Sequence, residues 1–441
     1  MRLEVGTFPV RDVVVGKRMA WDDGVLEIDV NELLDLVVQD PIEKAKIEVV
    51  KPGESARIIN YEDVLEPKVK VSGGGTVYPG VCGRPTDSVG EGRSHRLGSV
   101  GVVQCLDTAN VEASVADSRL WGRGGEKEVR VNSRFIDMSG EKTEIPAATP
   151  YAQLFNICVS VEAPTSVAFE EQSRAAASAT HRVADRLAEI VKDLEPPDVE
   201  VFDFEPKDDL PGVVYIPHLA SAEPQSGARG TYGTAVYGQT RLSAPWLLSP
   251  TEMMDGAVGG GGASWGGATW ILANHPVVMN LAERHGKDVN FLGCIVQRTN
   301  WTNQGEYTLV ADRAAWTAKM IGAKSAIITT DVRGQRWVGT MLTLAACERS
   351  GINTVLLTEE EDNENGNSPP LLFSPAELRG TVSNGTGDVP EPFSPVSRVV
   401  GTVEAAPQEW YGELPAVHGA YGAGVVYRDF YGFGRQSYAD F

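Results

Sequence analysis

The chain has 441 residues, of which 42% are hydrophobic, and its formal net charge is −21. The hydrophobic fraction is enough to fill folded cores, which excludes a largely disordered chain, and the length predicts two or three domains. The acidic charge argues against nucleic acid and anionic membrane surfaces as partners, because both are bound by an excess of lysine and arginine.

No targeting or membrane-spanning segment is expected. The first residues, MRLEVGTFPVRDVVVG, lack the apolar core of a signal peptide. No stretch approaches the roughly 20 apolar residues that a membrane span needs. We therefore expect a soluble, cytoplasmic protein.

Residues 1–150 are predicted to form a β-rich domain. A helix is expected at 31–38, a hairpin around the Pro-Gly-Glu-Ser turn at 52–55, and a loop-rich stretch from Gly73 to about Arg93. The expected strands are short apolar runs at 13–16, 25–29, 47–51, 56–60, 98–105 and 128–136.

From residue 151 the pattern changes to alternating strands and helices. Residues 154–161 form a continuous apolar run, as expected for a strand buried on both faces, and 166–194 predict one long helix that ends before Pro196 and Pro197. Further strands are expected at 199–204, 212–216, 289–296, 324–329 and 354–358, with helices at 276–285, 311–321 and 337–350. This alternation predicts a doubly wound, mainly parallel α/β region. We divide it into 151–274, with a glycine-rich loop, and 275–441, with a tail rich in Gly and Tyr.

The cysteines and histidines do not suggest a metal site or a disulfide framework. There are five cysteines, without any CxxC spacing, and six scattered histidines without an HxxxH or HxH pair. Buried structural thiols are expected, and no metal ion is expected.

The most unusual segment runs from Ser249 to Trp270 and contains four consecutive glycines, Gly259 to Gly262. Such a run suits a backbone that turns sharply or approaches a ligand closely. No Gly-Lys-Ser or Gly-Lys-Thr follows, so the segment is not a phosphate-binding P-loop. A nucleotide cradle and a flexible surface loop both remain open readings.

Several pieces of the chain, in order and spread over about 350 residues, carry a resemblance to a known family. They are DGVLEID (23–29), KPGESARII (51–59), VLEPKVKV (64–71), FIDMSG (135–140), SPTEMMDGA (249–257), NHPVV (274–278), ERHGKDVNFLG (283–293) and WTAKMIGAKSAIITT (316–330). Through them the chain resembles the alpha-plus-beta precursor subunits of component B in the glycine, sarcosine and betaine reductase complexes.

The resemblance implies a role in C–N bond cleavage. In that family this polypeptide and a second subunit form the substrate-recognising component. A selenocysteine or cysteine of a partner protein attacks the carbon that bears the amine, and the amine leaves. Typical precursors also cleave themselves at a cysteine just after the DGA element, which leaves a pyruvoyl group able to hold a primary amine as a Schiff base.

The sequence departs from that pattern at the cleavage site. No cysteine lies between Cys158 and Cys294, and Ala263 and Ser264 follow the glycine run where the cleavage cysteine is expected. Ser264 is the one residue here that offers the same chemistry, because a hydroxyl can also attack the preceding carbonyl. A hydroxyl is the weaker nucleophile without a base, so we expect an intact chain without a pyruvoyl cofactor.

Five further residues are site candidates. Asp255, beside the glycine run, and Asp331, after the expected strand 324–329, are candidate catalytic acid/base groups. Arg93 and His95 are candidates for holding a substrate carboxylate from a polar loop, and His218, at the end of an expected strand, is a third substrate-binding candidate. The alternatives are a solvated loop for Arg93 and His95 and a structural hydrogen bond for Asp255.

The sequence as a whole favours a substrate-binding subunit of a reductase-like complex that cleaves a C–N bond in a small amine or N-substituted acid. The expected partner is the second component B subunit, which carries the nucleophilic cysteine or selenocysteine. A non-reductive C–N hydrolase or lyase on the same scaffold is one alternative. A non-catalytic scaffold subunit is the other.

Overall fold

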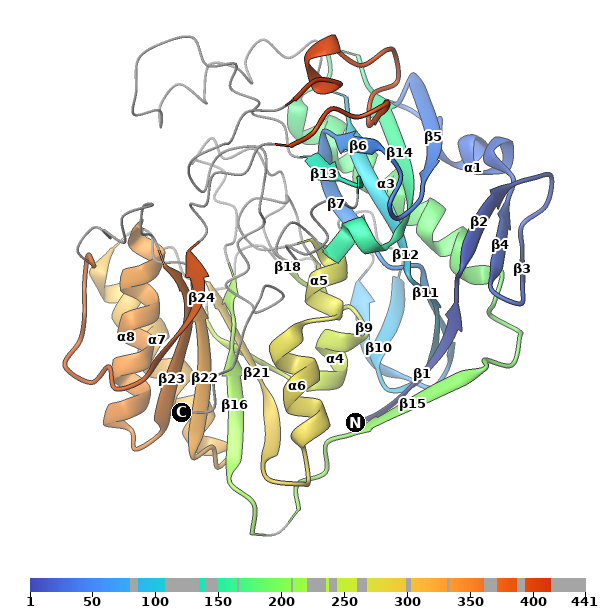
Figure 1. The fold of residues 1–441 in the computed structure, drawn as a ribbon. Coiled ribbons are helices and arrows are strands. Elements are labelled where there is room, and N and C mark those ends of the chain that lie inside the picture. Colours follow the sequence, from blue (N-terminus) through green and yellow to red (C-terminus); the bar gives the residue numbers. More distant parts are fainter. Residues whose placement is uncertain are drawn as a thin grey trace, which may run out of the picture.

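The computed structural model describes residues 1–79, 86–107, 135–139, 150–164, 166–207, 209–219, 235–237, 244–259, 268–298, 303–330, 334–360, 371–386 and 393–413. It has a mixed α/β fold, with sheets on both sides of a central group of helices (Figure 1). In the described part of the chain, no helix is long and apolar enough to cross a membrane.

The N-terminal part is built mostly from short strands. They are β1 (Arg2–Pro9), β2 (Asp12–Val15), β3 (Ala20–Asp22), β4 (Val25–Ile28), β5 (Lys44–Val50), β6 (Ala56–Ile59), β7 (Tyr61–Leu65), β8 (Lys68–Ser72), β9 (Gly75–Pro79), β10 (Thr86–Gly90), β11 (Gly92–Gly98), β12 (Val100–Leu106), β13 (Phe135–Asp137), β14 (Phe155–Glu162) and β15 (Asp198–Asp203). The helices here are α1 (Val30–Val37), η2 (Pro150–Gln153) and α3 (Phe169–Glu189).

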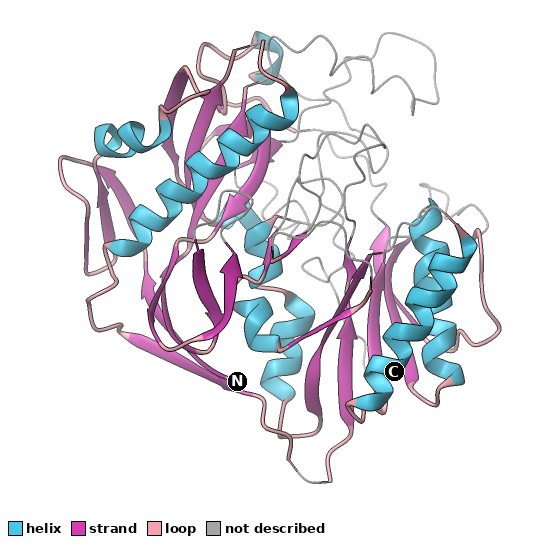
Figure 2. Ribbon diagram, turned by 180° about the vertical axis from the view of Figure 1, so that it is seen from behind, coloured by secondary structure: helices cyan, strands magenta, loops and turns pink. Residues whose placement is uncertain are grey.

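These strands form two four-stranded sheets, with orders β15-β1-β11-β8 and β5-β14-β12-β7, and smaller sheets around them. Helix α3 confirms the long helix expected at 166–194. It buries Ala176, Val183 and Leu187 in the same core as Val102 of β12 and Leu33 of α1. Figure 2 shows this helix lying across the N-terminal strands.

Two sequence-based expectations for this part are wrong. The strands around Pro-Gly-Glu-Ser do not pair as a hairpin, because β5 pairs with β14 whereas β6 pairs with β13 and β25 (Arg398–Val400). The stretch from Gly73 to Arg93 contains the hairpin β9–β10 and the start of β11 rather than a long loop. Its glycines serve close backbone approach, since a Cβ on Gly73 would lie 2.2 Å from the Cα of Gly92.

Residues beyond 150 complete the N-terminal sheets. Strand β14 is parallel to β12, β15 is antiparallel to β1, and β25 is parallel to β6. A domain boundary at residue 150 would therefore separate these strands from the partners to which they are hydrogen-bonded.

The second part is an α/β unit. Its strands are β16 (Gly212–Ile216), β17 (His218–Leu219), β18 (Ala235–Val236), β19 (Trp246–Leu248), β20 (Val258–Gly259), β21 (Asn290–Arg298), β22 (Ser325–Thr330), β23 (Asn353–Glu360) and β24 (Thr381–Thr386). Its helices are α4 (Pro250–Met254), α5 (Thr269–Ala273), α6 (Pro276–Arg284), α7 (Gln304–Met320), α8 (Gly334–Arg349) and, after β25, η3 (Gln408–Trp410).

Strands β21-β16-β22-β23-β24 are parallel neighbours in that order, which confirms the doubly wound prediction for this region. Side chains alternate between its two faces. Val214 and Ile216 face α7 and α8, whereas Val213 and Tyr215 face the core that includes α4, α5 and α6. Because that second core also contains β1, β5 and β6 side chains such as Leu3, the central helices join the parallel sheet to the N-terminal sheets (Figure 1).

Candidate functional site

Residues 249–259 and 268–275 lie between the two halves of the molecule, where α4 contacts both β10 and β21. Helix α4 starts with a capping box in which the Ser249 side chain and Glu252 satisfy each other's backbone N–H groups, and Pro250 occupies its first turn. Glu252 is buried and also accepts hydrogen bonds from the Tyr237 hydroxyl (2.7 Å) and the Thr76 hydroxyl (3.0 Å). The entrance to the glycine-rich loop is therefore tied to the β9–β10 hairpin.

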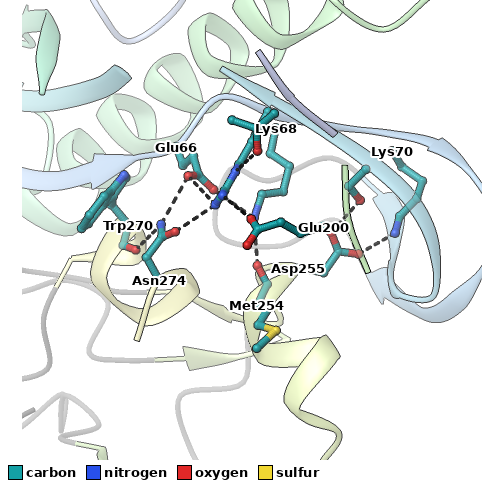
Figure 3. A network of polar contacts seen from close by, with 11 residues as sticks. Glu66, Lys68, Lys70, Glu200, Met254, Asp255, Trp270 and Asn274 are labelled. Atoms are coloured by element: carbon teal, nitrogen blue, oxygen red, sulfur yellow. Dashed lines mark hydrogen bonds and ion pairs between the residues drawn. The ribbon is translucent and has the colours of Figure 1, made fainter. Parts of the chain in front are cut away.

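Asp255, directly after α4, is held by residues of the N-terminal strands. Its carboxylate forms a buried ion pair with Lys70 (Figure 3). It also accepts hydrogen bonds from the Gly90 N–H (2.8 Å) and the Ser94 hydroxyl (2.7 Å). Lys70 Nζ also donates to the Glu91 carbonyl at 2.8 Å. These contacts fix the start of the glycine-rich loop. They agree with the alternative role for Asp255, a structural hydrogen bond.

The far end of the loop is held by a second buried carboxylate, Asp63 of β7. Its two oxygens accept hydrogen bonds from the backbone N–H and the hydroxyl of Thr269, each at 2.7 Å, and one oxygen also accepts from the Val64 N–H at 2.8 Å. The N-cap residue of α5, Ala268, has no side chain that can cap the helix, and Asp63 caps it from another element. Burial raises the pKa of Asp63 to about 7, although these hydrogen bonds act in the opposite direction.

A third buried acid, Glu66, holds the end of α5. Arg96 Nη1 donates to the Asn274 side chain (3.1 Å), and Asn274 donates to Glu66 (3.3 Å) and to the Trp270 carbonyl (3.0 Å) (Figure 3). Lys68 lies 3.0 Å from the other Glu66 oxygen. Burial alone would raise the pKa of Glu66, but the charges of Lys68 and Arg96 outweigh it and lower the pKa.

Residues 260–267, which include Ser264, lie outside the described residues, but both ends of the loop are fixed by buried acid groups. Sequence reasoning missed Asp63, Glu66 and Lys70 as contributors to this arrangement. A signal was present in VLEPKVKV, where Glu66, Lys68 and Lys70 alternate along an apolar stretch. In an extended segment, side chains two residues apart point to the same side, so Glu66, Lys68 and Lys70 are expected on one face.

The loop candidates Arg93 and His95 lie on strand β11, so the expected polar loop is wrong. Arg93 donates from Nε and Nη2 to Glu4 Oε2 on the neighbouring strand β1, at 2.9 and 2.7 Å, and this lowers the pKa of Glu4. His95 is buried, with Nδ1 2.9 Å from the Val191 carbonyl. Ser94, between them, is the residue that contacts Asp255, because strand side chains alternate in direction.

A buried hydrogen-bond chain connects α6 to the parallel sheet. The Val277 N–H donates to Nδ1 of His275 at 3.3 Å, so the neutral ring carries its proton on Nε2. Nε2 therefore donates to the Tyr215 hydroxyl (3.0 Å), and that hydroxyl shares a hydrogen bond with the Thr329 hydroxyl (2.7 Å). Burial lowers the pKa of His275 to about 3, which keeps the ring neutral.

The carboxyl ends of the parallel strands form the second candidate region. Strand β16 lies between β21, the next long strand of the sheet in sequence, and β22, which follows β21. The strand order therefore reverses at β16, and ligands of such sheets bind at the carboxyl ends of the strands beside such a reversal. His218 lies there, on β17, paired in register with Gln297 of β21. Asp331 follows β22 in the sequence and lies outside the described part of the chain.

Polar groups gather at this edge. The Thr340 hydroxyl donates to Thr330 Oγ1 (3.2 Å), the Thr358 hydroxyl donates to the Thr330 carbonyl (2.8 Å), and all three threonines are buried. Asp255 contacts other elements, since Lys70, Gly90 and Ser94 belong to β8, β10 and β11. Within the described ranges, no three His, Cys, Asp or Glu side chains form a group that could hold a metal ion.

Comparison with known proteins identifies the family. The family of glycine/sarcosine/betaine reductase component B subunits matches residues 1–417. The chain is 31% identical over 422 residues to the betaine reductase complex component B subunit alpha of Peptoclostridium acidaminophilum, which covers 92% of this chain and 89% of that protein. It is 29% identical over 419 residues to the sarcosine reductase complex component B subunit alpha of the same organism, covering 92% and 90%.

A third relative is the glycine reductase complex component B subunits alpha and beta of Acetoanaerobium sticklandii, 29% identical over 416 residues, covering 91% of this chain and 89% of that protein. No solved structure matches the chain. The similarity extends across the described fold and both candidate regions. The chain therefore belongs to the family of glycine/sarcosine/betaine reductase component B subunits.

Proposed function

We propose that this chain is the substrate-binding subunit of a reductase complex that cleaves the C–N bond of a small amine or N-substituted acid. The observation that carries this proposal is the family match over residues 1–417, which includes both sheets and the central helices between them. The relatives are named as component B subunits of glycine, sarcosine and betaine reductase complexes, which supports a role within an assembly.

The nucleophile of the reaction is proposed to come from a partner subunit that carries a reactive cysteine or selenocysteine. Four of the five cysteines of this chain are described, and all four are buried: Cys105, Cys158, Cys294 and Cys347. Burial raises the pKa of Cys158, Cys294 and Cys347, so these three stay protonated, whereas a nucleophile must be a thiolate. Cys82 lies outside the described residues.

In the proposed step, a thiolate or selenolate of the partner forms a bond to the carbon that bears the amine. The C–N bond breaks, and the amine leaves with its electron pair and takes up a proton. The contribution of this chain is to bind and orient the substrate. The proposed place for the substrate is the carboxyl edge of the parallel sheet, where His218 of β17 pairs with Gln297 of β21. Asp331, which follows β22 in the sequence, is a proposed catalytic group for the same substrate.

The pyruvoyl group of typical family precursors is not part of this proposal. Its formation needs a nucleophilic side chain at one peptide bond after Asp255, Gly256 and Ala257, and no cysteine occurs between Cys158 and Cys294. The proposed substrate therefore binds without a Schiff base to this chain.

The test is an assay of this chain, the partner subunit and the two together, with glycine, sarcosine or betaine as substrate and a dithiol as reductant. We expect amine release only from the pair, with one dithiol oxidised per amine released. Amine release without dithiol oxidation would instead indicate the hydrolase or lyase alternative. If the partner alone turned over substrate as fast as the pair, this chain would be a non-catalytic scaffold subunit.

A further inference from the structure

Gln297 is a buried amide whose two ends have different surroundings. It lies at the carboxyl end of β21 and is 3% exposed. Its Nε2 donates to the Thr343 hydroxyl oxygen on α8 at 2.9 Å. The Thr343 hydroxyl itself donates to the Gly339 carbonyl at 3.1 Å, so it accepts from Gln297 and fixes which end of the amide is the nitrogen.

The other end, Oε1, is buried and has no hydrogen-bond donor among the described residues. A buried acceptor without a partner destabilises a fold, so a retained one calls for an explanation such as a ligand. Other unpaired buried atoms, such as those of His95, Asn156 and Ser160, belong to strands of the N-terminal sheets. Gln297 differs from them because it lies at the carboxyl edge of a parallel sheet, where such folds bind ligands.

The position of Gln297 within the sheet also favours a site. It is next to the point at which the strand order reverses, since β21 neighbours β16, and it is paired with His218 of β17. It lies on the sheet face covered by α7 and α8, through its bond to Thr343. The amide is thus held from the helix side by its nitrogen, which leaves the oxygen as a fixed acceptor.

We propose that Gln297 Oε1 accepts a hydrogen bond from an N–H group of a small amine bound at the carboxyl edge of the parallel sheet. This inference rests on the proposed function and specifies its substrate class. An ammonium or secondary amine carries the required hydrogen, whereas a quaternary amine such as betaine carries none. Gln297 is therefore a specificity-determining residue that favours glycine and sarcosine over betaine.

The test measures binding of glycine, sarcosine and betaine by calorimetry to the complex of this chain with its partner subunit. In Gln297→Leu, we expect affinity for glycine and sarcosine to fall at least about tenfold, as for loss of a hydrogen bond to a charged group, while betaine affinity stays equal or rises. Thr343→Val, which releases the amide nitrogen but keeps the acceptor, should give a smaller loss of the same selectivity.

Gln172→Leu is the matched control, because Gln172 is a buried glutamine that donates to the Pro164 and Val167 carbonyls at the start of α3. It should leave the ratio of sarcosine to betaine affinity unchanged, whatever its effect on thermal stability. An unchanged ratio in Gln297→Leu would overturn the inference while leaving the proposed function intact. A wild-type complex that binds betaine but neither glycine nor sarcosine would also overturn the inference alone, whereas failure to bind any of the three would overturn both.

Discussion

Nε2 of His275 lies 3.0 Å from the hydroxyl oxygen of Tyr215, and both side chains are buried between α6 and the parallel sheet. The imidazole is neutral there because burial lowers its pKa to about 3. In the unfolded chain the pKa of a histidine is about 6.5. Between pH 3 and pH 6.5 the unfolded state therefore binds a proton at His275 that the folded state does not bind.

This difference predicts acid sensitivity. Because the folded-state pKa is the lower one, the stability it gives is present above pH 6.5 and is lost as the pH falls toward 3. For this residue alone we expect a loss of about 2 kcal/mol in unfolding free energy between pH 7.5 and pH 5. Urea unfolding of the wild type and of His275→Gln at both pH values measures it, and an equal change in the two proteins would contradict the assignment.

Asp63 predicts the opposite pH dependence. Its folded-state pKa of about 7 is raised above the ordinary value, so the folded state binds the extra proton between about pH 4 and 7 and is stabilised as the pH falls through that window. Asp63→Asn cannot ionise, and its carbonyl can still accept from the Thr269 N–H. We expect this variant to exceed the wild type in unfolding free energy at pH 8 by on the order of 4 kcal/mol, and to lose most of that advantage at pH 4.

The comparison of urea midpoints at pH 8 and pH 4 decides the matter. Glu66→Gln is a useful control, since charged neighbours lower the pKa of Glu66 and its replacement should weaken the protein at pH 8 instead. A destabilised Asp63→Asn at pH 8 would show that the carboxylate form is the one the fold prefers.

The ion pair of Lys70 and Asp255 is expected to be sensitive to loss of one partner. Both side chains are almost fully buried, with 9% and 3% of their surface exposed, so Lys70→Met leaves a buried carboxylate without its cation. We expect a loss of about 3–5 kcal/mol in unfolding free energy, and partial recovery in Lys70→Met/Asp255→Asn. Arg284→Ala breaks the exposed pair with Asp288 and should change stability by less than about 1 kcal/mol. Equal losses in Lys70→Met and Arg284→Ala would show that the buried pair is unimportant.

The glycine-rich loop carries a prediction about processing. Without a cysteine between Cys158 and Cys294, we expect a single band near 47.4 kDa on a denaturing gel. Ser264→Ala should migrate identically. Two fragments in the wild type, with a blocked new N-terminus that reacts with a carbonyl reagent, and their loss in Ser264→Ala, would identify Ser264 as a pyruvoyl precursor.

The parallel sheet could be predicted from the sequence because its signals are local. Apolar runs such as 212–216 and 324–329 alternate with helical segments at short distances along the chain, and the strands β16 and β22 lie where those runs predict. Asp255 was also recognised as a notable residue from its place beside the glycine run, although its partners were not.

The polar contacts of the site depend on residues far apart in sequence. Lys70 and Asp255 are 185 residues apart, and Asp63 and Thr269 are 206 residues apart. No periodicity within a window reports such pairs, since a buried acid and a surface acid look alike in a sequence. The expected loop around Arg93 and His95 is wrong for a related reason. Polar residues and glycines are typical of loops, but this segment is a strand because it pairs with β1 and β8, which are distant in sequence.

The three-stranded sheet β13-β6-β25 has a consequence for synthesis of the protein. Strand β6 is made early, but its parallel partner β25 comes more than 330 residues later, and Arg57 of β6 donates from Nη2 to the Ser394 carbonyl just before that strand. The N-terminal part therefore cannot finish folding while the ribosome is still translating the parallel sheet. At synthesis rates of roughly 5–20 residues per second, an unpaired edge of β6 waits for tens of seconds. We therefore expect the nascent chain to need a chaperone that covers the unpaired edge of β6 until residue 400 has been translated.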